Sequence, residues 1–144
     1  MCSHYEAPAP QRVVETFGVE PYEQGKLNLW PGYTGPFIRG VEHVDLEAES
    51  PVPNEVLAGS FGLIPSWSKD TKIVRHTYNC RSETASVKPS YRTAWRQARH
   101  CIIPAVAIYE PDWRTGKPIP TRIVRSDGEL MGIAMIFIFL FHVA

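Results

Sequence analysis

Proline is the residue type that most constrains how this chain can fold. Its 144 residues include 13 prolines, and they are spread between residues 8 and 120. Proline has no backbone N–H and disrupts the interior of a helix, so this composition favours short strands and turns over long helices. The strongest turn signals are Pro31-Gly32, the stretch 114–118 and Asp127-Gly128.

The composition is that of an ordinary globular protein. Hydrophobic residues make up 44% and charged residues 21%, and the length suits one domain with its own core. The net charge is zero, so contact with nucleic acid has to come from a local patch. The polar, proline-containing start does not resemble a signal peptide, and three cysteines are an odd number. We therefore expect a reduced, cytoplasmic protein without a disulfide framework.

The first half of the chain is predicted to form one helix and two strands. Residues 11–17 show the helical spacing of apolar side chains. A strand is expected to start at 37–39, and another to run over 56–65, where Gly62 allows close approach of another backbone segment. Residues 42–55 are acidic and contain proline, which is typical of an exposed loop.

The second half is predicted to hold the clearest helix and the most apolar strands. Over 89–99 the apolar residues recur with helical spacing. A second face of this helix carries three arginines: Arg92, Arg96 and Arg99. That face is either solvated or a contact for phosphates. The apolar run 101–110 predicts a buried strand, and the run 132–144, too short to span a bilayer, predicts either a central strand or a terminus altered by truncation.

Cys2 has the most specific chemistry in the chain. If Met1 is removed, Cys2 carries a free α-amine and a thiol on adjacent carbons. The amine can condense with an aldehyde to an imine, and the thiol can then close a five-membered thiazolidine ring. Ordinary pKa values of about 8 for the amine and about 8.5 for the thiol suit this chemistry near neutral pH. Position alone favours the simpler interpretation of a small buried hydrophobic residue.

Further polar and aromatic residues are candidates for a site. Three alternating polar residues would share one face of an extended segment at 77–84: Asn79, Arg81 and Glu83. Such a face suits a site, or equally a solvated strand edge. Glu110 would end the buried strand, where partial burial suits a carboxyl group to general acid–base catalysis. Trp67 lies in a predicted loop and is either a core anchor or a platform for a stacked base.

In order along the chain, these motifs resemble the SOS-response-associated peptidase (SRAP) family of abasic-site processing proteins. The match runs from residue 1 to about residue 134, and the ordered set is far more specific than any one motif. Its landmarks are Met1-Cys2, NLWPG at 28–32, FGLIPSW at 61–67, NCRSET at 79–84, KPSYR at 88–92, CIIP at 101–104 and IYE at 108–110.

The resemblance implies a compact α+β fold, mostly β, with a few short helices. It implies autocatalytic removal of Met1 by a peptidase activity, followed by a covalent thiazolidine crosslink between Cys2 and abasic sites in single-stranded DNA. The chain would then be a hydrolase with lyase-type chemistry that acts in the SOS response to DNA damage. We expect single-stranded and junction DNA as partners, and a monomer associated with the nucleoid in the bacterial cytoplasm. No membrane contact, metal or cofactor is expected.

The resemblance also implies roles for residues at matching positions. Cys2 matches the nucleophile, and Asn79 matches the asparagine that holds the crosslinked sugar and the cysteine amine. Glu110 matches the glutamate that helps remove the methionine and transfers protons during ring formation. We expect Cys2, Asn79 and Glu110 to converge within hydrogen-bond reach, about 3 Å directly or through one water.

Three further residues match DNA contacts in the family. Arg81 matches a phosphate-binding arginine, and Trp67 and Pro31 match residues that support or wedge the DNA near the lesion. Two departures lie beside the nucleophile, because Ser3 and His4 stand where the family pattern has glycine and a DNA-contacting arginine.

The end of the chain departs from the family pattern as well. No segment matches the later family motif that carries a catalytic histidine, and His142 lies in an unrelated apolar context. Residues 1–144 are therefore predicted to form a single domain that lacks the C-terminal part of the family fold.

Two alternative functions remain open from the sequence. One is a catalytically impaired remnant that binds single-stranded DNA without forming an adduct. The other is a conventional cysteine hydrolase, which needs Cys2 or Cys101 paired in space with a histidine. The neighbouring His100 does not provide such a pair simply by adjacency. Zinc is not expected, because the Cys and His residues are scattered and no CxxC motif occurs.

Overall fold

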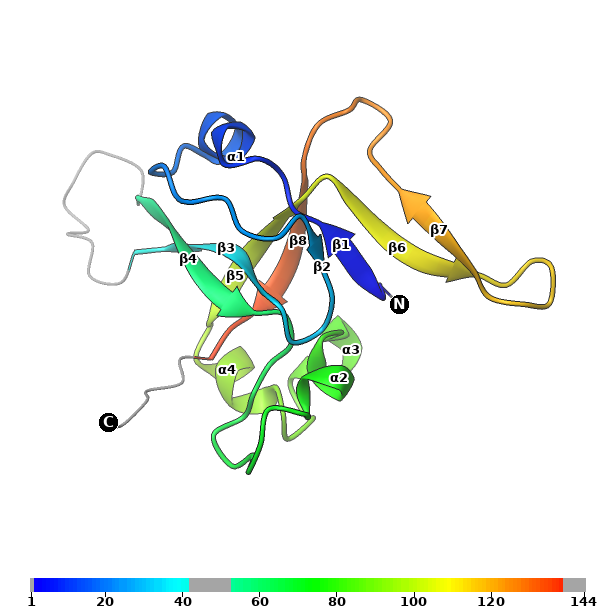
Figure 1. Ribbon diagram of the computed structural model, residues 1–144. Helices are drawn as coiled ribbons and strands as arrows, with labels where there is room; N and C mark the ends of the chain where they lie inside the picture. The colour runs from blue at the N-terminus through cyan, green and yellow to red at the C-terminus, as the bar shows by residue number, and fades with distance from the viewer. Residues whose placement is uncertain (1, 42–52, 139–144) are drawn as a thin grey trace.

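The computed structural model describes residues 2–41 and 53–138, which form two antiparallel four-stranded sheets (Figure 1). Sheet A has the strand order β2 (Asn28–Leu29), β1 (His4–Glu6), β6 (Ala107–Asp112) and β7 (Ile119–Ile123). Sheet B has the order β4 (Asn54–Ser60), β3 (Thr34–Gly40), β5 (His100–Ala105) and β8 (Met131–Ile136). The predicted fold class, α+β and mostly β, is confirmed.

The helices in the described part of the chain are short, as the prolines predict. They are α1 (Pro10–Phe17), α2 (Val74–Thr77), α3 (Ser82–Ala85) and α4 (Arg92–Arg96). None of these helices is long and apolar enough to span a membrane.

The main core lies between the two sheets. Tyr5 and Leu29 of sheet A, exposed by only 1% and 0%, pack in one cluster with Ile103 and Ala105 of sheet B. A second cluster holds α3 and α4 against β8, and a third packs α1 against β3. A hairpin made of β6 and β7 projects from this body as an arm (Figure 1). The expected single domain over residues 1–144 stays a prediction.

Helix α1 confirms the prediction for 11–17. Val13 is fully buried, while Val14 and Phe17 are partly buried on the same side. The helix starts at Pro10, whose missing N–H costs nothing in the first turn. It ends at Gly18, which has a φ of 64° and donates its N–H to the carbonyl of Val14.

Strand β4 is shifted relative to the predicted strand over 56–65. It starts at Asn54 and ends at Ser60, so residues 54 and 55 of the expected exposed loop belong to the strand. Residues 42–52 of that loop lie outside the described residues. Gly62 confirms the expected close approach: its φ is 115°, and an added Cβ would lie 2.8 Å from the Val74 carbonyl oxygen.

The prediction of an extended segment at 77–84 is wrong. Helix α2 ends at Thr77 and α3 begins at Ser82. The Thr77 hydroxyl donates to the carbonyls of Leu63, at 2.6 Å, and Ile73, at 3.0 Å, and this fixes the buried end of α2. Asn79, Arg81 and Glu83 therefore do not share the face of a strand.

The helix predicted over 89–99 is shortened to α4. The chain leaves the helix where Ala98 takes a φ of 50°, and the Arg99 N–H then donates to the Ala94 carbonyl. Tyr91 and Ala94 are buried as expected, but the Trp95 side chain is 37% exposed. Fewer of the helically spaced apolar side chains are therefore buried than the sequence predicts.

The apolar run 101–110 forms two strands instead of one. β5 belongs to sheet B and β6 to sheet A, and Val106 joins them while donating its N–H to the Glu6 carbonyl. Glu110 consequently lies inside β6, which continues to Asp112, and not at a strand end.

Two further strand predictions are corrected. β8 lies at the edge of sheet B, whereas the run 132–144 predicted a central strand, and residues 139–144 lie outside the described residues. The turn at Asp127-Gly128 is present but joins β7 to β8 in different sheets, so it closes no hairpin. The predicted turn at 114–118 does close the β6–β7 hairpin, with Gly116 at a φ of 79°.

Candidate active site

Cys2 lies just before β1 and is held there by backbone hydrogen bonds. The N–H of Ser3 donates to the Tyr109 carbonyl at 2.8 Å, which extends the pairing of β1 with β6 by one residue. The Cys2 thiol donates to the carbonyl of His4 at 3.1 Å. Its half-buried side chain packs against the main core cluster and lines a cavity of about 110 Å³. Other residues around this cavity, which we call the Cys2 cavity, include Phe61, Asn79, Cys80 and Ile103.

Asn79 contacts Cys2 directly. The Asn79 side-chain amide donates to the Cys2 carbonyl at 3.1 Å, although the two residues are 77 positions apart. The Asn79 carbonyl accepts a hydrogen bond from the Tyr91 hydroxyl at 3.1 Å. Tyr91 is itself buried beside α4, so the helical region anchors the amide that reaches Cys2.

Glu110 faces the same side of sheet A as Cys2. Alternate residues of a strand share a face, so Glu110 lies on the side of Ile108, which packs against the core cluster that Cys2 also contacts. Burial raises the pKa of the Cys2 thiol, and the negative charge of Glu110 raises it further, while backbone hydrogen bonds oppose both effects. The thiol is therefore protonated near neutral pH and needs a nearby base to accept its proton.

The opposite face of sheet A carries an aromatic stack that the sequence did not predict. The His4 ring lies between Trp30 and Tyr109, with centroid distances of 4.0 and 3.9 Å and an interplanar angle of 12° to each. His4, which stands where the family pattern has a DNA-contacting arginine, is thus engaged in the protein's own packing. The pairing of His4 with Tyr109 across two strands could be found only from the strand register.

Glu6, on the same outer face, accepts hydrogen bonds from two residues. Glu6 accepts two hydrogen bonds of 2.8 Å from the Arg122 guanidinium and a short one from the Tyr109 hydroxyl. These donors lower the pKa of Glu6 to about 2.

The three expected DNA-contact residues occupy different positions around the site. Pro31 lies in a turn whose Gly32 N–H donates to the Phe61 carbonyl at 2.7 Å, next to a wall of the Cys2 cavity. Arg81 is exposed two residues beyond Asn79, at the start of α3. Trp67 is 57% exposed in a loop and does not line the cavity. Asn79 thus contacts Cys2, and the charge of Glu110 acts on the Cys2 thiol, whereas Trp67 is not part of the cavity wall. That Glu110 lies within hydrogen-bond reach of Cys2 stays a prediction.

A Cys–His pair for a conventional hydrolase is not formed within residues 2–41 and 53–138. The Cys2 thiol bonds the His4 backbone, while the His4 ring is held in its stack. Burial raises the pKa of the Cys101 thiol to about 12, and the His100 ring packs edge-on against Trp95. The same ranges hold no group of three Cys, His, Asp or Glu residues able to bind a metal.

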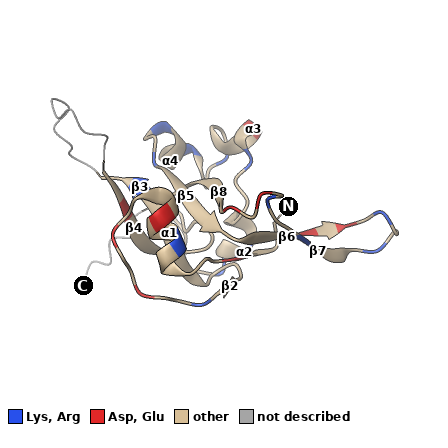
Figure 2. Cartoon of the chain, turned by 90° about the horizontal axis from the view of Figure 1, so that it is seen from above, with Lys and Arg blue, Asp and Glu red and all other residues tan. Residues whose placement is uncertain are grey.

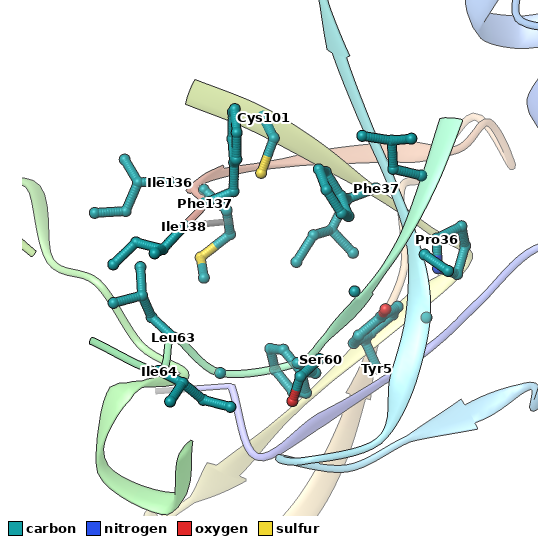
Figure 3. Close-up of a pocket in the computed structure, with 18 residues that line it drawn as sticks. Tyr5, Pro36, Phe37, Ser60, Leu63, Ile64, Cys101, Ile136, Phe137 and Ile138 are labelled. Carbon is teal, nitrogen blue, oxygen red and sulfur yellow. The ribbon is translucent and has the colours of Figure 1, made fainter. Parts of the chain in front are cut away.

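A larger, apolar cavity lies beside the Cys2 cavity. It has a volume of about 370 Å³ and is lined by residues that include Cys101, Phe37 and Phe137 (Figure 3). Phe61, Ile103 and Met135 line both cavities and so separate them. Cys101 therefore lies in a hydrophobic wall, whereas Cys2 contacts the polar side chain of Asn79 as well as the core.

Comparison with known proteins finds related chains in bacteria and vertebrates. The abasic site processing protein YoqW of Bacillus subtilis is 42% identical over 80 residues, which cover 54% of this chain and 34% of YoqW. The abasic site processing protein HMCES of Gallus gallus is 32% identical over 96 residues, which cover 65% of this chain and 28% of HMCES. The chain thus spans about a third of the length of these two relatives.

A solved structure and a family profile also match this chain. A crystal structure of a Bordetella bronchiseptica protein matches with a TM-score of 0.74 and 42% identity, covering 92% of this chain and 62% of that one. The sequence profile of the SOS response associated peptidase (SRAP) family matches residues 1–140. The chain therefore belongs to the SRAP family.

Proposed function

We propose that this chain processes abasic sites in DNA through a covalent adduct at Cys2. Two relatives, YoqW and HMCES, carry the name of abasic site processing proteins. The observation that carries the proposal is the hydrogen bond from the Asn79 amide to the Cys2 carbonyl, on the face of sheet A that also bears Glu110. The contact supports a role for the Asn79 amide in positioning Cys2, and Glu110 is proposed as the proton acceptor that the same chemistry requires.

The first step is hydrolysis of the peptide bond between Met1 and Cys2. Water attacks the Met1 carbonyl carbon, Glu110 accepts a proton from that water, and the proton passes to the departing nitrogen of Cys2. The products are free methionine and a chain that begins with the α-amine of Cys2. This step accounts for a self-processing peptidase activity without a metal.

The second step joins Cys2 to the ring-opened aldehyde of an abasic site. The amine adds to the aldehyde carbon and loses water, which leaves an imine. The thiol sulfur then bonds to the imine carbon while its proton reaches the nitrogen through Glu110, so one water is released overall and a thiazolidine ring remains. A lasting imine would acidify the neighbouring carbon and favour strand cleavage, so ring closure protects the strand.

The roles of the remaining residues follow the same proposal. Asn79 holds the Cys2 backbone and the sugar, and Arg81 binds a phosphate next to the lesion. Pro31 and the exposed Trp67 support the bases of single-stranded or junction DNA. We further propose that the protein acts as a monomer on nucleoid DNA in the bacterial cytoplasm, within the SOS response to DNA damage.

The test combines mass spectrometry with a denaturing gel. We expect the purified protein to lack Met1 and to form a covalent adduct with a single-stranded oligonucleotide that contains an abasic site, but none with an intact oligonucleotide. Cys2→Ala should abolish the adduct, whereas Cys101→Ala, in the other cavity, should retain it. Retention of Met1, or an adduct that survives Cys2→Ala, would overturn the proposal, and salt-sensitive binding without an adduct would identify a DNA-binding remnant.

A further inference from the structure

Charge is distributed unevenly along this chain although its total is zero. Residues 69–99 contain eight lysines and arginines but only two acidic residues, a net charge of +6 that the rest of the chain balances. This region comprises α2, α3, α4 and the loops that connect them. The helical region thus forms a local positive patch on a neutral protein.

Three side chains of this patch form a regular line, which we call the basic stripe: Lys88, Arg92 and Arg96. They are four residues apart, and the Arg92 N–H donates to the Lys88 carbonyl at 2.9 Å, so Lys88 lies one turn before Arg92 and Arg96, which share one side of α4. All three are exposed, while Tyr91 and Ala94 hold the other side of α4 in the core. Figure 2 shows the blue of basic residues on α4, whose basic residues are Arg92 and Arg96.

The basic stripe differs in its ion pairs from the cations of the projecting arm and of the turn that follows the arm. There, Arg114 pairs with Asp112 at 2.6 Å, Arg122 with Glu6 at 2.8 Å and Arg125 with Asp127 at 2.5 Å. In residues 2–41 and 53–138, no ion pair involves a member of the stripe. Three regularly spaced charges without a protein counterion fit an external polyanion.

The stripe starts next to the Cys2 cavity. Lys88 is close enough to lower the pKa of the Cys80 thiol, which lines that cavity, although burial raises this pKa more strongly. Tyr91, which lies between Lys88 and Arg92 in the sequence, donates its hydroxyl hydrogen to the carbonyl of Asn79. A strand with a nucleotide at Cys2 can therefore continue along α4.

We propose that the basic stripe binds backbone phosphates of the single-stranded DNA that continues from the abasic residue held at Cys2. This inference rests on the proposed function and extends it by naming the path of the strand. Phosphates occur in every sequence, so the stripe contributes affinity and register without reading bases. It also explains how a chain of zero net charge binds DNA with enough local charge to hold several nucleotides.

The test measures binding of an intact deoxythymidine oligonucleotide, which cannot form the adduct, between about 50 and 200 mM salt. In the triple variant Lys88→Gln, Arg92→Gln and Arg96→Gln, we expect the slope of log K against log salt to become shallower by about 2, since each phosphate contact on a single strand contributes about 0.7. The single variant Arg96→Gln should change the slope by about 0.7. Glutamine preserves helix propensity, and circular dichroism checks the fold.

A matched control removes the same charge elsewhere. Arg114→Gln, Lys117→Gln and Arg125→Gln together should leave the slope as in the wild type, because these side chains lie on the arm and the following turn. An unchanged slope in both stripe variants, or an equal change in the control, would overturn the inference.

A second assay separates this inference from the proposed function. With 2-deoxyribose, an aldehyde without phosphate, the triple variant should form the Cys2 adduct as fast as the wild type, while its adduct with dilute abasic DNA should form more slowly. If the wild type forms neither adduct, the proposed function fails, and the salt slopes still decide whether the stripe binds DNA. A variant that reacts more slowly even with 2-deoxyribose would show that the stripe acts on the site itself, against the inference.

Discussion

The two faces of sheet A differ in character although the same two strands supply them. On the inner face, Cys2 lines a cavity and its thiol has a pKa that burial and the charge of Glu110 raise. On the outer face, His4 is stacked between two aromatic rings and Glu6 is bound by Arg122 and Tyr109. The comparison suggests a division of labour between the two faces: the outer face fixes the position of β1, and the inner face presents the reactive groups.

This division has a physical basis in the pleat of a strand. Tyr109 and Glu110 are successive residues of β6, so their side chains point to opposite faces, whereas Cys2 precedes β1 and packs towards the core. The stack and the ion pair immobilise His4 and Glu6, and the short segment before them then has little freedom. A reactive group on a fixed strand loses less entropy when it reaches the geometry of reaction.

The largest expected effect comes from the inner face. Glu110→Gln keeps the shape of the side chain but cannot accept a proton, so adduct formation with abasic DNA should fall by about 100-fold. Rapid quenching followed by a denaturing gel measures this rate. The exposed Glu129→Gln serves as the control and should react like the wild type. If Glu110→Gln reacts as fast as the wild type, the Glu110 carboxylate takes no part in the reaction.

A medium effect is expected from the aromatic stack. His4→Ala removes two ring contacts, each worth about 0.5–1.5 kcal/mol, so the free energy of unfolding should fall by about 1–2 kcal/mol. Urea unfolding measures this change, and His76→Ala, which removes an exposed ring outside any aromatic pair, is the control. The rate of adduct formation should fall far less than in Glu110→Gln, because His4 bonds the Cys2 thiol through its backbone carbonyl. A large loss of rate without a loss of stability would contradict the division between the faces.

The smallest effect is expected from the ion pair of the outer face. The pKa of Glu6 is lowered from 4.5 to about 2, so its contribution to stability is present above about pH 4.5 and is lost as the pH falls towards 2. Arg122→Gln should therefore lower the melting temperature at neutral pH, by an amount that shrinks in this acidic range. The effect is small because the Arg122 side chain is 45% exposed. Lys117→Gln should give a difference that does not vary over this range, and an Arg122→Gln difference that grows in acid would contradict the prediction.

Elements with local signals were predicted well. The spacing of Val13, Val14 and Phe17 predicted α1, and the turn at 114–118 predicted a hairpin. Gly62 was expected to allow a close approach, and it does so because its φ is positive and α2 lies against it. In each case the conformation follows from the residue type or from spacing within one or two turns.

Elements without a local signal were predicted poorly. The run 101–110 is apolar throughout, and apolarity alone does not tell one long strand from two strands in different sheets. Alternation at Asn79, Arg81 and Glu83 suggested a strand, yet buried hydrogen bonds of Thr77 place two short helices there. The contact of Asn79 with Cys2 was expected only through the family resemblance, because the two residues are 77 positions apart.

By itself, the sequence determined the family, the limit on helix length and the reactive chemistry that is available to Cys2. These properties depend on residue types and on order along the chain, which folding does not change. Only the tertiary structure decided that β1 pairs with β6, and therefore that Tyr109 stacks on His4 while its neighbour Glu110 lies on the opposite face. The reason is that strand register joins residues more than a hundred positions apart, and a shift of one residue would exchange the two faces.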